Sequence, residues 1–164
     1  MKQQLAFCIS ILGLLATPAL SQQSATNSTA ACTFQDGKQL GIQYEKVPSL
    51  KKVDLSSGKL WTPGEKPMVL FTQADLTVGH SQIPVGAYSL YFIPGKDHWT
   101  LVVNKGIKKG QYEQQQDLVR VAMDVGQLST PEQFNLFFAH VAPKQCNLRI
   151  YEGKTGAWAE FHEK

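Results

Sequence analysis

The chain has 164 residues, of which 43% are hydrophobic and 18% are charged, with 16 basic and 13 acidic side chains. This composition supplies enough apolar material for one packed domain and too little charge for a disordered chain. The formal net charge of +3 excludes a strongly basic nucleic-acid-binding protein, because such proteins concentrate positive charge in one block.

The first 21 residues have the layout of a secretory signal peptide. Lys2 gives a positive start, residues 5–16 are almost wholly apolar, and small residues lead up to Ser21. We therefore predict export to the periplasm or the exterior, with cleavage after Ser21. A transmembrane anchor is one alternative, but it needs about 20 apolar residues. Lipidation at Cys32 is another, although this cysteine lies well past the apolar run.

The mature chain is expected to contain a short leader and one domain. Residues 22–37 are mostly small and polar, which favours a flexible leader ahead of a single domain over residues 38–164. No stretch of the mature chain is apolar enough to span a bilayer. Removal of the signal peptide also removes Cys8 and leaves Cys32 and Cys146. In an oxidising compartment such a pair favours a disulfide, and two free thiols are the alternative.

Short apolar or alternating runs, separated by turn residues about every ten positions, fill the domain. They predict strands at 41–45, 68–73, 76–80, 84–93, 99–104, 118–125, 134–141, 145–151 and 157–162. The helical candidates are single turns at 111–116 and 130–133. Eight or nine antiparallel strands with short turns predict an all-β domain, either a jelly-roll-like β-sandwich or a partly closed barrel.

Two junctions have the composition of hairpin turns. Residues 94–97 (PGKD) separate two strands, and a register that sets Phe92 opposite Leu101 also sets Leu90 opposite Val103. The apolar faces of the two strands agree in that register, as a buried hairpin requires. Residues 153–156 (GKTG) are expected to join the last two strands in the same way.

A motif in the middle of the chain resembles a known bacterial family. Residues 83–90 read IPVGAYSL, residues 93–100 read IPGKDHWT, and Asn104-Lys105 follows. This pattern is similar to the signature of the domain of unknown function 2911 family, and the resemblance extends over residues 38–161. It implies an extracytoplasmic β-sandwich-like domain with no established activity. Physically, the motif consists of turn residues and inward-facing core residues.

One segment departs from the family pattern. Members usually carry a Trp-Arg-Thr-Gly-Ala-Asn-Glu-like segment just before the strand that precedes the signature, whereas residues 61–68 read WTPGEKPM, without the Arg or the Asn. If that polar segment forms a site in the family, this chain has altered or lost it.

No spacing in the sequence announces a catalytic or metal site. The four histidines lack the close ligand spacing of metal motifs, so we predict no metal, no cofactor and no assigned catalytic residue. The polar candidates for a site are His80, His140, Glu160 and His162. Glu160 and His162 share one face of the last strand, where they are candidates for a general base with its orienting residue or for half of a metal site.

Two groups of residues are candidates for binding. Lys105, Lys108 and Lys109 form a cluster suited to an anionic polysaccharide or to lipid headgroups, unless the loop is simply solvated. The aromatic residues are numerous enough for a sugar-stacking face, although aromatic side chains in a β domain more often belong to the core. They are Trp61, Trp99, Trp158, Tyr91 and Tyr151.

The sequence therefore favours a non-catalytic domain that binds a ligand or a partner protein at the bacterial envelope. One alternative is an envelope hydrolase whose histidine and carboxylate meet only in the folded protein. Another is a structural subunit of an envelope assembly, which predicts a large exposed apolar patch. The oligomeric state is left open.

Overall fold

The structure of the chain is a computed structural model that describes residues 26–46, 58–64, 66–107 and 111–164. The expected signal peptide lies outside these residues, as do Lys108 and Lys109. The described part of the chain contains nine strands, one short 3-10 helix and no α-helix, which confirms the all-β prediction. Within the same residues, no helix has the length and apolarity needed to cross a membrane.

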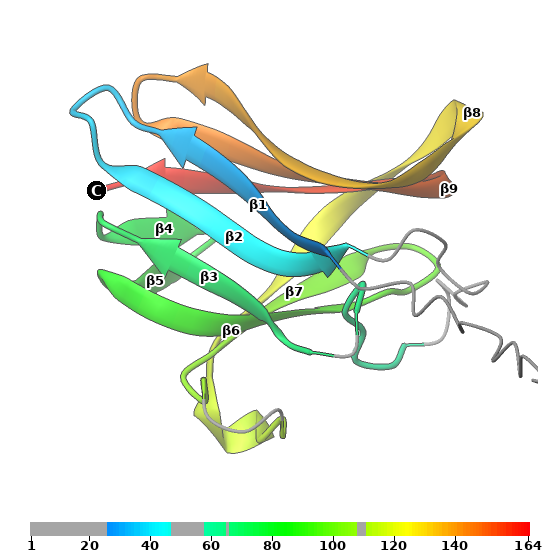
Figure 1. Cartoon of the computed structure of the whole chain (residues 1–164), viewed down its shortest axis with the longest axis horizontal. Coiled ribbons are helices and arrows are strands. Elements are labelled where there is room, and N and C mark those ends of the chain that lie inside the picture. Colours follow the sequence, from blue (N-terminus) through cyan, green and yellow to red (C-terminus); the bar gives the residue numbers. More distant parts are fainter. Residues whose placement is uncertain (1–25, 47–57, 65, 108–110) are drawn as a thin grey trace, which may run out of the picture.

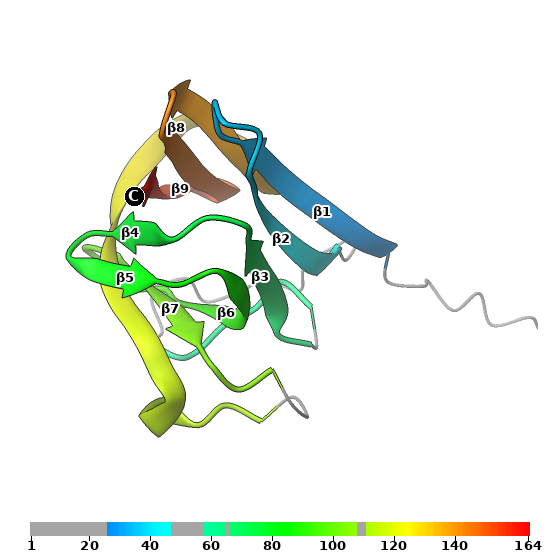
Figure 2. The same cartoon turned by 90° about the vertical axis from the view of Figure 1, so that its left-hand side faces the viewer.

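The strands form one antiparallel sheet in the order β1-β2-β3-β6-β7-β8-β9-β4-β5. The sheet curls around a single core without closing into a barrel (Figures 1 and 2). Its elements are β1 (Thr26–Thr33), β2 (Gln39–Lys46), β3 (Met68–Thr72), β4 (Leu76–Val78), β5 (Ser81–Ile83), β6 (Gly86–Ile93), β7 (Trp99–Asn104), the 3-10 helix η1 (Gln114–Gln116), β8 (Asp117–Ala142) and β9 (Gln145–Glu163).

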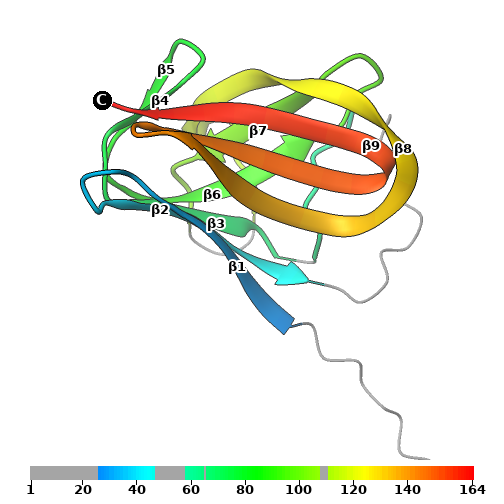
Figure 3. The same cartoon turned by 90° about the horizontal axis from the view of Figure 1, so that it is seen from above.

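Strands β8 and β9 pair with each other and double back on themselves half-way along (Figure 3). At the bend, β8 advances five residues from Gln127 to Glu132 (132 − 127), while β9 advances two between Gly153 and Thr155 (155 − 153). The extra residues let β8 cover the longer path on the outside of the bend. Gly153, in the inner strand β9, has a φ of 59°, a conformation that glycine adopts without a Cβ clash.

The core lies inside the curl of the sheet and is built from alternating residues of the strands. The predicted hairpin is confirmed, because Phe92 pairs with Leu101 and Leu90 pairs with Val103. The largest fully buried side chains are those of Trp99, Phe34, Phe92, Phe161, Leu40, Ile42, Met68, Leu70, Leu76, Ile83, Leu90 and Leu101.

Asn104, the asparagine of the family motif, fastens the loop that follows β7. Its side-chain amide donates to the backbone oxygen of Glu113 and to Asp117 Oδ1, both at 2.8 Å. The other carboxylate oxygen of Asp117 accepts from the Tyr112 hydroxyl at 2.7 Å and from the Arg120 guanidinium at 2.8 Å. Because the Asn104 amide and the Asp117 carboxylate both have hydrogen-bond partners, this part of the motif has an architectural role.

The prediction of a flexible leader over residues 22–37 is wrong for Thr26–Thr33, which form strand β1. This strand pairs with β2 from Thr26↔Lys46 to Thr33↔Gln39. Its inward residues Ala30 and Cys32 are buried. Small inward side chains gave the segment little hydrophobic signal, whereas the ladder of backbone hydrogen bonds with β2 does not depend on side-chain size.

Other local predictions also differ from the structure. Residues 130–133, expected to form a single helical turn, belong to strand β8. Residues 153–156 were expected to form a hairpin turn, but they continue β9, because both halves of β9 pair with β8 rather than with each other. Residues 81–83, which lie between the predicted strands 76–80 and 84–93, form strand β5, which pairs with β4. Glycine and polar residues indicated the turn at 153–156, and a neighbouring strand made the backbone extended instead.

A disulfide bridges the opening between the first strand of the sheet and β9. Cys32 in β1 and Cys146 in β9 are bonded, with their Cα atoms 6.4 Å apart and a separation of 114 positions in sequence. Nearby, the backbone N–H of Gln35 donates to the backbone oxygen of Pro143 at 3.0 Å. The predicted pairing of Cys32 with Cys146 is therefore confirmed.

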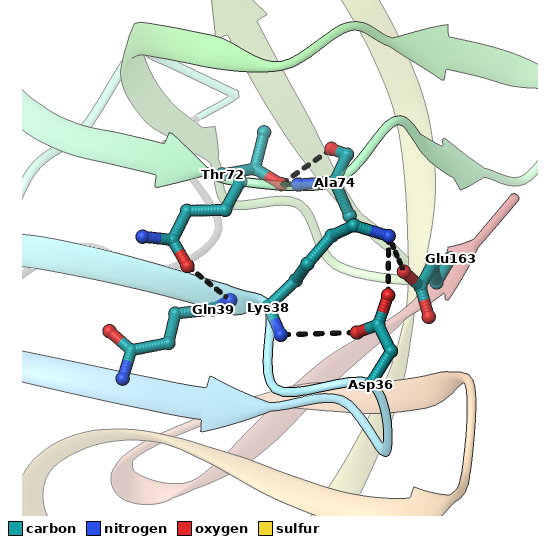
Figure 4. Close-up of polar contacts among 7 residues, drawn as sticks. Asp36, Lys38, Gln39, Thr72, Ala74 and Glu163 are labelled. Carbon is teal, nitrogen blue, oxygen red and sulfur yellow. Dashed lines mark hydrogen bonds and ion pairs between the residues drawn. The ribbon is translucent and has the colours of Figure 1, made fainter.

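A charged cluster holds the same opening at the end of β9 (Figure 4). The Lys38 ammonium donates to Glu163 Oε1 at 2.9 Å and also pairs with Asp36. The hydrogen bonds with Asp36 and Glu163 raise the pKa of Lys38, and the bonds from Lys38 lower the pKa of Asp36. Glu163 is almost fully buried, and the ion pair with Lys38 compensates its carboxylate for the water lost on burial.

We predict that removal of the disulfide lowers the free energy of unfolding by about 4 kcal/mol, because the bond closes a loop of more than a hundred residues in the unfolded chain. The measurement is urea unfolding of the oxidised protein and of the Cys32→Ser/Cys146→Ser double variant. Addition of a reductant should bring the oxidised protein to the midpoint of the double variant and leave the variant unchanged. Equal midpoints with and without the bond would contradict the prediction.

Candidate functional site

The structure separates three of the four histidines from any carboxylate partner. His80, His98 and His140 are exposed, and none of them forms an ion pair within the described residues. His162 does, because its Nε2 lies 3.4 Å from Glu160 Oε2, with the two side chains 46% and 52% exposed. The sequence thus correctly placed Glu160 and His162 on one face. No cluster of three or more potential metal ligands occurs in the described ranges.

The aromatic residues that sequence analysis grouped together divide into two sets. Trp61 and Trp99 belong to the interior cluster, where their rings lie 5.9 Å apart edge to face. Tyr91 is buried under the Tyr112 ring at 5.3 Å. Tyr151 and Trp158 are instead half-buried on the outer side of β9. Of the five aromatic candidates for a sugar-stacking face, Tyr151 and Trp158 therefore remain.

A cleft lies between the two halves of β9, which run side by side (Figure 3). At one end, the Glu163 amide joins them by donating to the backbone oxygen of Lys144 at 2.8 Å. Near the bend, the Tyr151 ring of the first half lies against Gly156 of the second. The cleft has a volume of about 230 Å³, and its lining is Asn147, Arg149, Tyr151 and Trp158.

Strand alternation explains why these four side chains face outward. In the first half of β9, Cys146, Leu148 and Ile150 are fully buried, and this turns the alternate residues Asn147, Arg149 and Tyr151 to the outer face. In the second half, Ala157 and Ala159 are buried and Trp158 faces outward. Because β9 doubles back, two outer faces that would be far apart on a straight strand border one cleft.

A pair of glycines forms the surface on which the two aromatic rings rest. Gly126 of β8 pairs with Gly156 of β9. A Cβ atom on Gly126 would lie 2.9 Å from the Trp158 ring, and one on Gly156 would lie 3.2 Å from the Tyr151 ring. Any side chain at these positions would press on the rings. Phe137 also packs edge to face on Tyr151 at 5.5 Å, which restricts the tyrosine further.

Arg149 is the charged residue of the cleft, and within the described part of the chain its guanidinium has no hydrogen bond and no ion pair. The side chain is half-buried and lies opposite Phe137 in the strand register. Asn147, next along the same face, accepts a weak hydrogen bond from the Gln145 amide at 3.3 Å. The guanidinium and the Asn147 amide nitrogen thus remain available as donors to a ligand.

A second cleft of about 340 Å³ lies where β1 and β2 meet Lys66 and Pro67. These two residues belong to the segment that departs from the family pattern. The charges in this cleft already neutralise each other, since the Lys66 ammonium donates to Glu45 Oε1 at 2.6 Å. We therefore regard the cleft of β9, with its unpaired arginine and two outward aromatic rings, as the stronger candidate.

Glu152 follows Tyr151 on the other face of β9, and its Oε2 atom is buried without a hydrogen-bond partner among the described residues. Burial raises the pKa of the Glu152 carboxyl. A carboxyl whose pKa is higher in the folded state makes the protein less stable as pH rises through the interval between the unfolded-state and folded-state values.

We therefore predict that Glu152→Gln is more stable than the unaltered protein at pH 7, and that this advantage disappears below about pH 4, where the carboxyl is protonated in both states. Urea midpoints measured at pH 3.5, 5 and 7 would show it. Glu132→Gln, at an exposed position of β8, is the control. If both variants showed the same pH dependence, burial of Glu152 would not be the cause.

Comparison with known proteins gives a family but no close relative. The model of a family described as a protein of unknown function, domain of unknown function 2911, matches residues 25–160. No curated protein and no solved structure matches the chain. The matched range includes all nine strands apart from the last residues of β9. The chain therefore belongs to the domain of unknown function 2911 family.

Proposed function

We propose that this chain is an exported, non-catalytic binding domain that takes one ring of a saccharide in the cleft of β9. The observation that carries the proposal is the pair of outward aromatic rings, Tyr151 and Trp158, held over the Gly126–Gly156 pair. Aromatic faces stack on the apolar faces of sugar rings, while nearby polar groups bind the hydroxyls.

The chemistry and the size of the cleft both support binding. Its lining supplies two aromatic faces, a guanidinium and an amide, which hold and orient a ligand and do not serve as a general base or a nucleophile. A volume of about 230 Å³ is below the range of about 300–1,000 Å³ typical of pockets for whole small molecules. One ring of a longer chain suits this space.

The contact between His162 and Glu160 favours a second candidate, the envelope hydrolase. Such a pair has the composition of a general base and its orienting residue. Both side chains are about half exposed, however, and neither lines the β9 cleft. Turnover of a glycan that is lost in His162→Ala and retained in His140→Ala would favour the hydrolase over the binding domain.

We predict that a chain expressed with residues 1–21 in a bacterial host is exported and begins at Gln22. Intact-mass and N-terminal sequence analysis of the extracytoplasmic fraction measure this directly. A charge placed in the apolar run, as in Leu12→Arg, should leave the precursor uncleaved. A mass consistent with a lipid on Cys32 would overturn the proposal, and it would also conflict with the Cys32–Cys146 disulfide.

We predict that Trp158→Ala weakens binding of an oligosaccharide by at least tenfold, because one stacking face is lost. The measurement is calorimetric titration with the oligosaccharides that a glycan array identifies. Phe71→Ala is the matched control, since Phe71 also faces outward and lies over a glycine of its neighbouring strand, Gly41. Equal losses in both variants, or the absence of any bound glycan, would contradict the proposal.

A further inference from the structure

We infer that the saccharide bound in the β9 cleft carries a carboxylate, as a hexuronic acid does, and that Arg149 binds this group. The inference rests on the proposed function, because it names the class of sugar that the same cleft accepts. It is drawn from the hydrogen-bond partners of the two arginines, from the spacing along β9 and from the charges around the cleft.

The chain contains two arginines, and their surroundings differ. Arg120 donates to Asp117 Oδ2 and to the Tyr112 hydroxyl, both at 2.8 Å. Arg120 is exposed, whereas Arg149 is half-buried and yet has no such partner within the described residues. A guanidinium that has lost part of its hydration and gained no anion is poorly compensated. A carboxylate from the ligand would supply the bidentate partner that arginine favours.

The spacing along β9 places the guanidinium beside the stacking surface. Arg149 stands between Asn147 and Tyr151 on one face of the strand, about 6.6 Å from each along the backbone. Trp158 borders the same cleft from the second half of β9. A sugar ring that stacks on the aromatic residues presents its exocyclic carboxylate at the edge of the ring. Arg149 and the Asn147 amide are the donors that lie along that edge.

The outer face beyond Trp158, outside the lining of the cleft, is acidic. Trp158 pairs with Asp124 of β8, and Glu160 lies two residues further along β9 on the same outer face. Carboxylates there repel a second carboxylate. The acidic group of the sugar therefore faces Arg149 and points away from Asp124 and Glu160.

The test compares acidic sugars with neutral sugars of otherwise equal structure. Tetrasaccharides of galacturonic, mannuronic and glucuronic acid are each titrated beside their carboxyl-reduced neutral forms, with the full mature chain at 0.15 M salt. We expect at least one acid to bind tenfold or more tightly than its neutral form. Arg149→Gln should remove this preference, and Arg149→Lys, which keeps the charge without the planar fork, should retain part of it.

Control variants separate the inference from the proposed function. Lys154→Gln removes an exposed positive charge from the bend of β9 and should leave the preference intact. Equal binding of acidic and neutral forms, with both weakened by Trp158→Ala, would overturn the acidic class and leave the saccharide site standing. A preference that survives in Arg149→Gln would overturn the role of Arg149. Failure of every oligosaccharide to bind would overturn the proposed function itself.

Discussion

An extended strand of 26 residues, such as β8, would be about 85 Å long, whereas a domain of this size has a radius of gyration of about 14 Å. The β8–β9 pair must therefore turn back on itself, and much of the structure depends on how it does so. The bend needs extra residues on the outer strand and glycines on the inner one. By folding over, a single long hairpin supplies two stretches of sheet, one beside β7 and the other close to β1.

The same fold-back leaves an opening that covalent and ionic links secure. The sheet order ends at β1, so no ladder joins β1 to the returning half of the hairpin. The Cys32–Cys146 disulfide spans this opening, and the pairing of Lys38 with Glu163 fixes it where β9 ends. A sheet with an unsecured opening would expose both its core and its unpaired strand edges. An oxidising destination, which the disulfide needs in order to form, is consistent with the proposed export.

The candidate cleft is a consequence of this architecture rather than an addition to it. Outward residues of a strand normally meet only solvent, but the two halves of β9 bring two rows of outward residues to the sides of one cleft. The paired glycines at positions 126 and 156 leave the backbone bare, and the rings of Tyr151 and Trp158 cover it. Covering a glycine with an aromatic ring stabilises a sheet on its own. Arg149, which has no ion-pair or hydrogen-bond partner among the described residues, adds a chemistry directed at a ligand beside the rings.

The sequence by itself determined the all-β class, most strand positions, the Phe92–Leu101 register and the family, because alternation and turn composition are local properties. Its cysteine number favoured the pairing of Cys32 with Cys146, which the structure confirms. The sequence also placed Glu160 and His162 on one face. It missed β1, whose inward residues are small, and it misread residues 153–156 as a hairpin turn. The cleft could not be predicted from the sequence, because Arg149 and Trp158 become neighbours only when β9 doubles back. Which outward residues meet is decided by long-range pairing with β8, and this information resides in the tertiary structure.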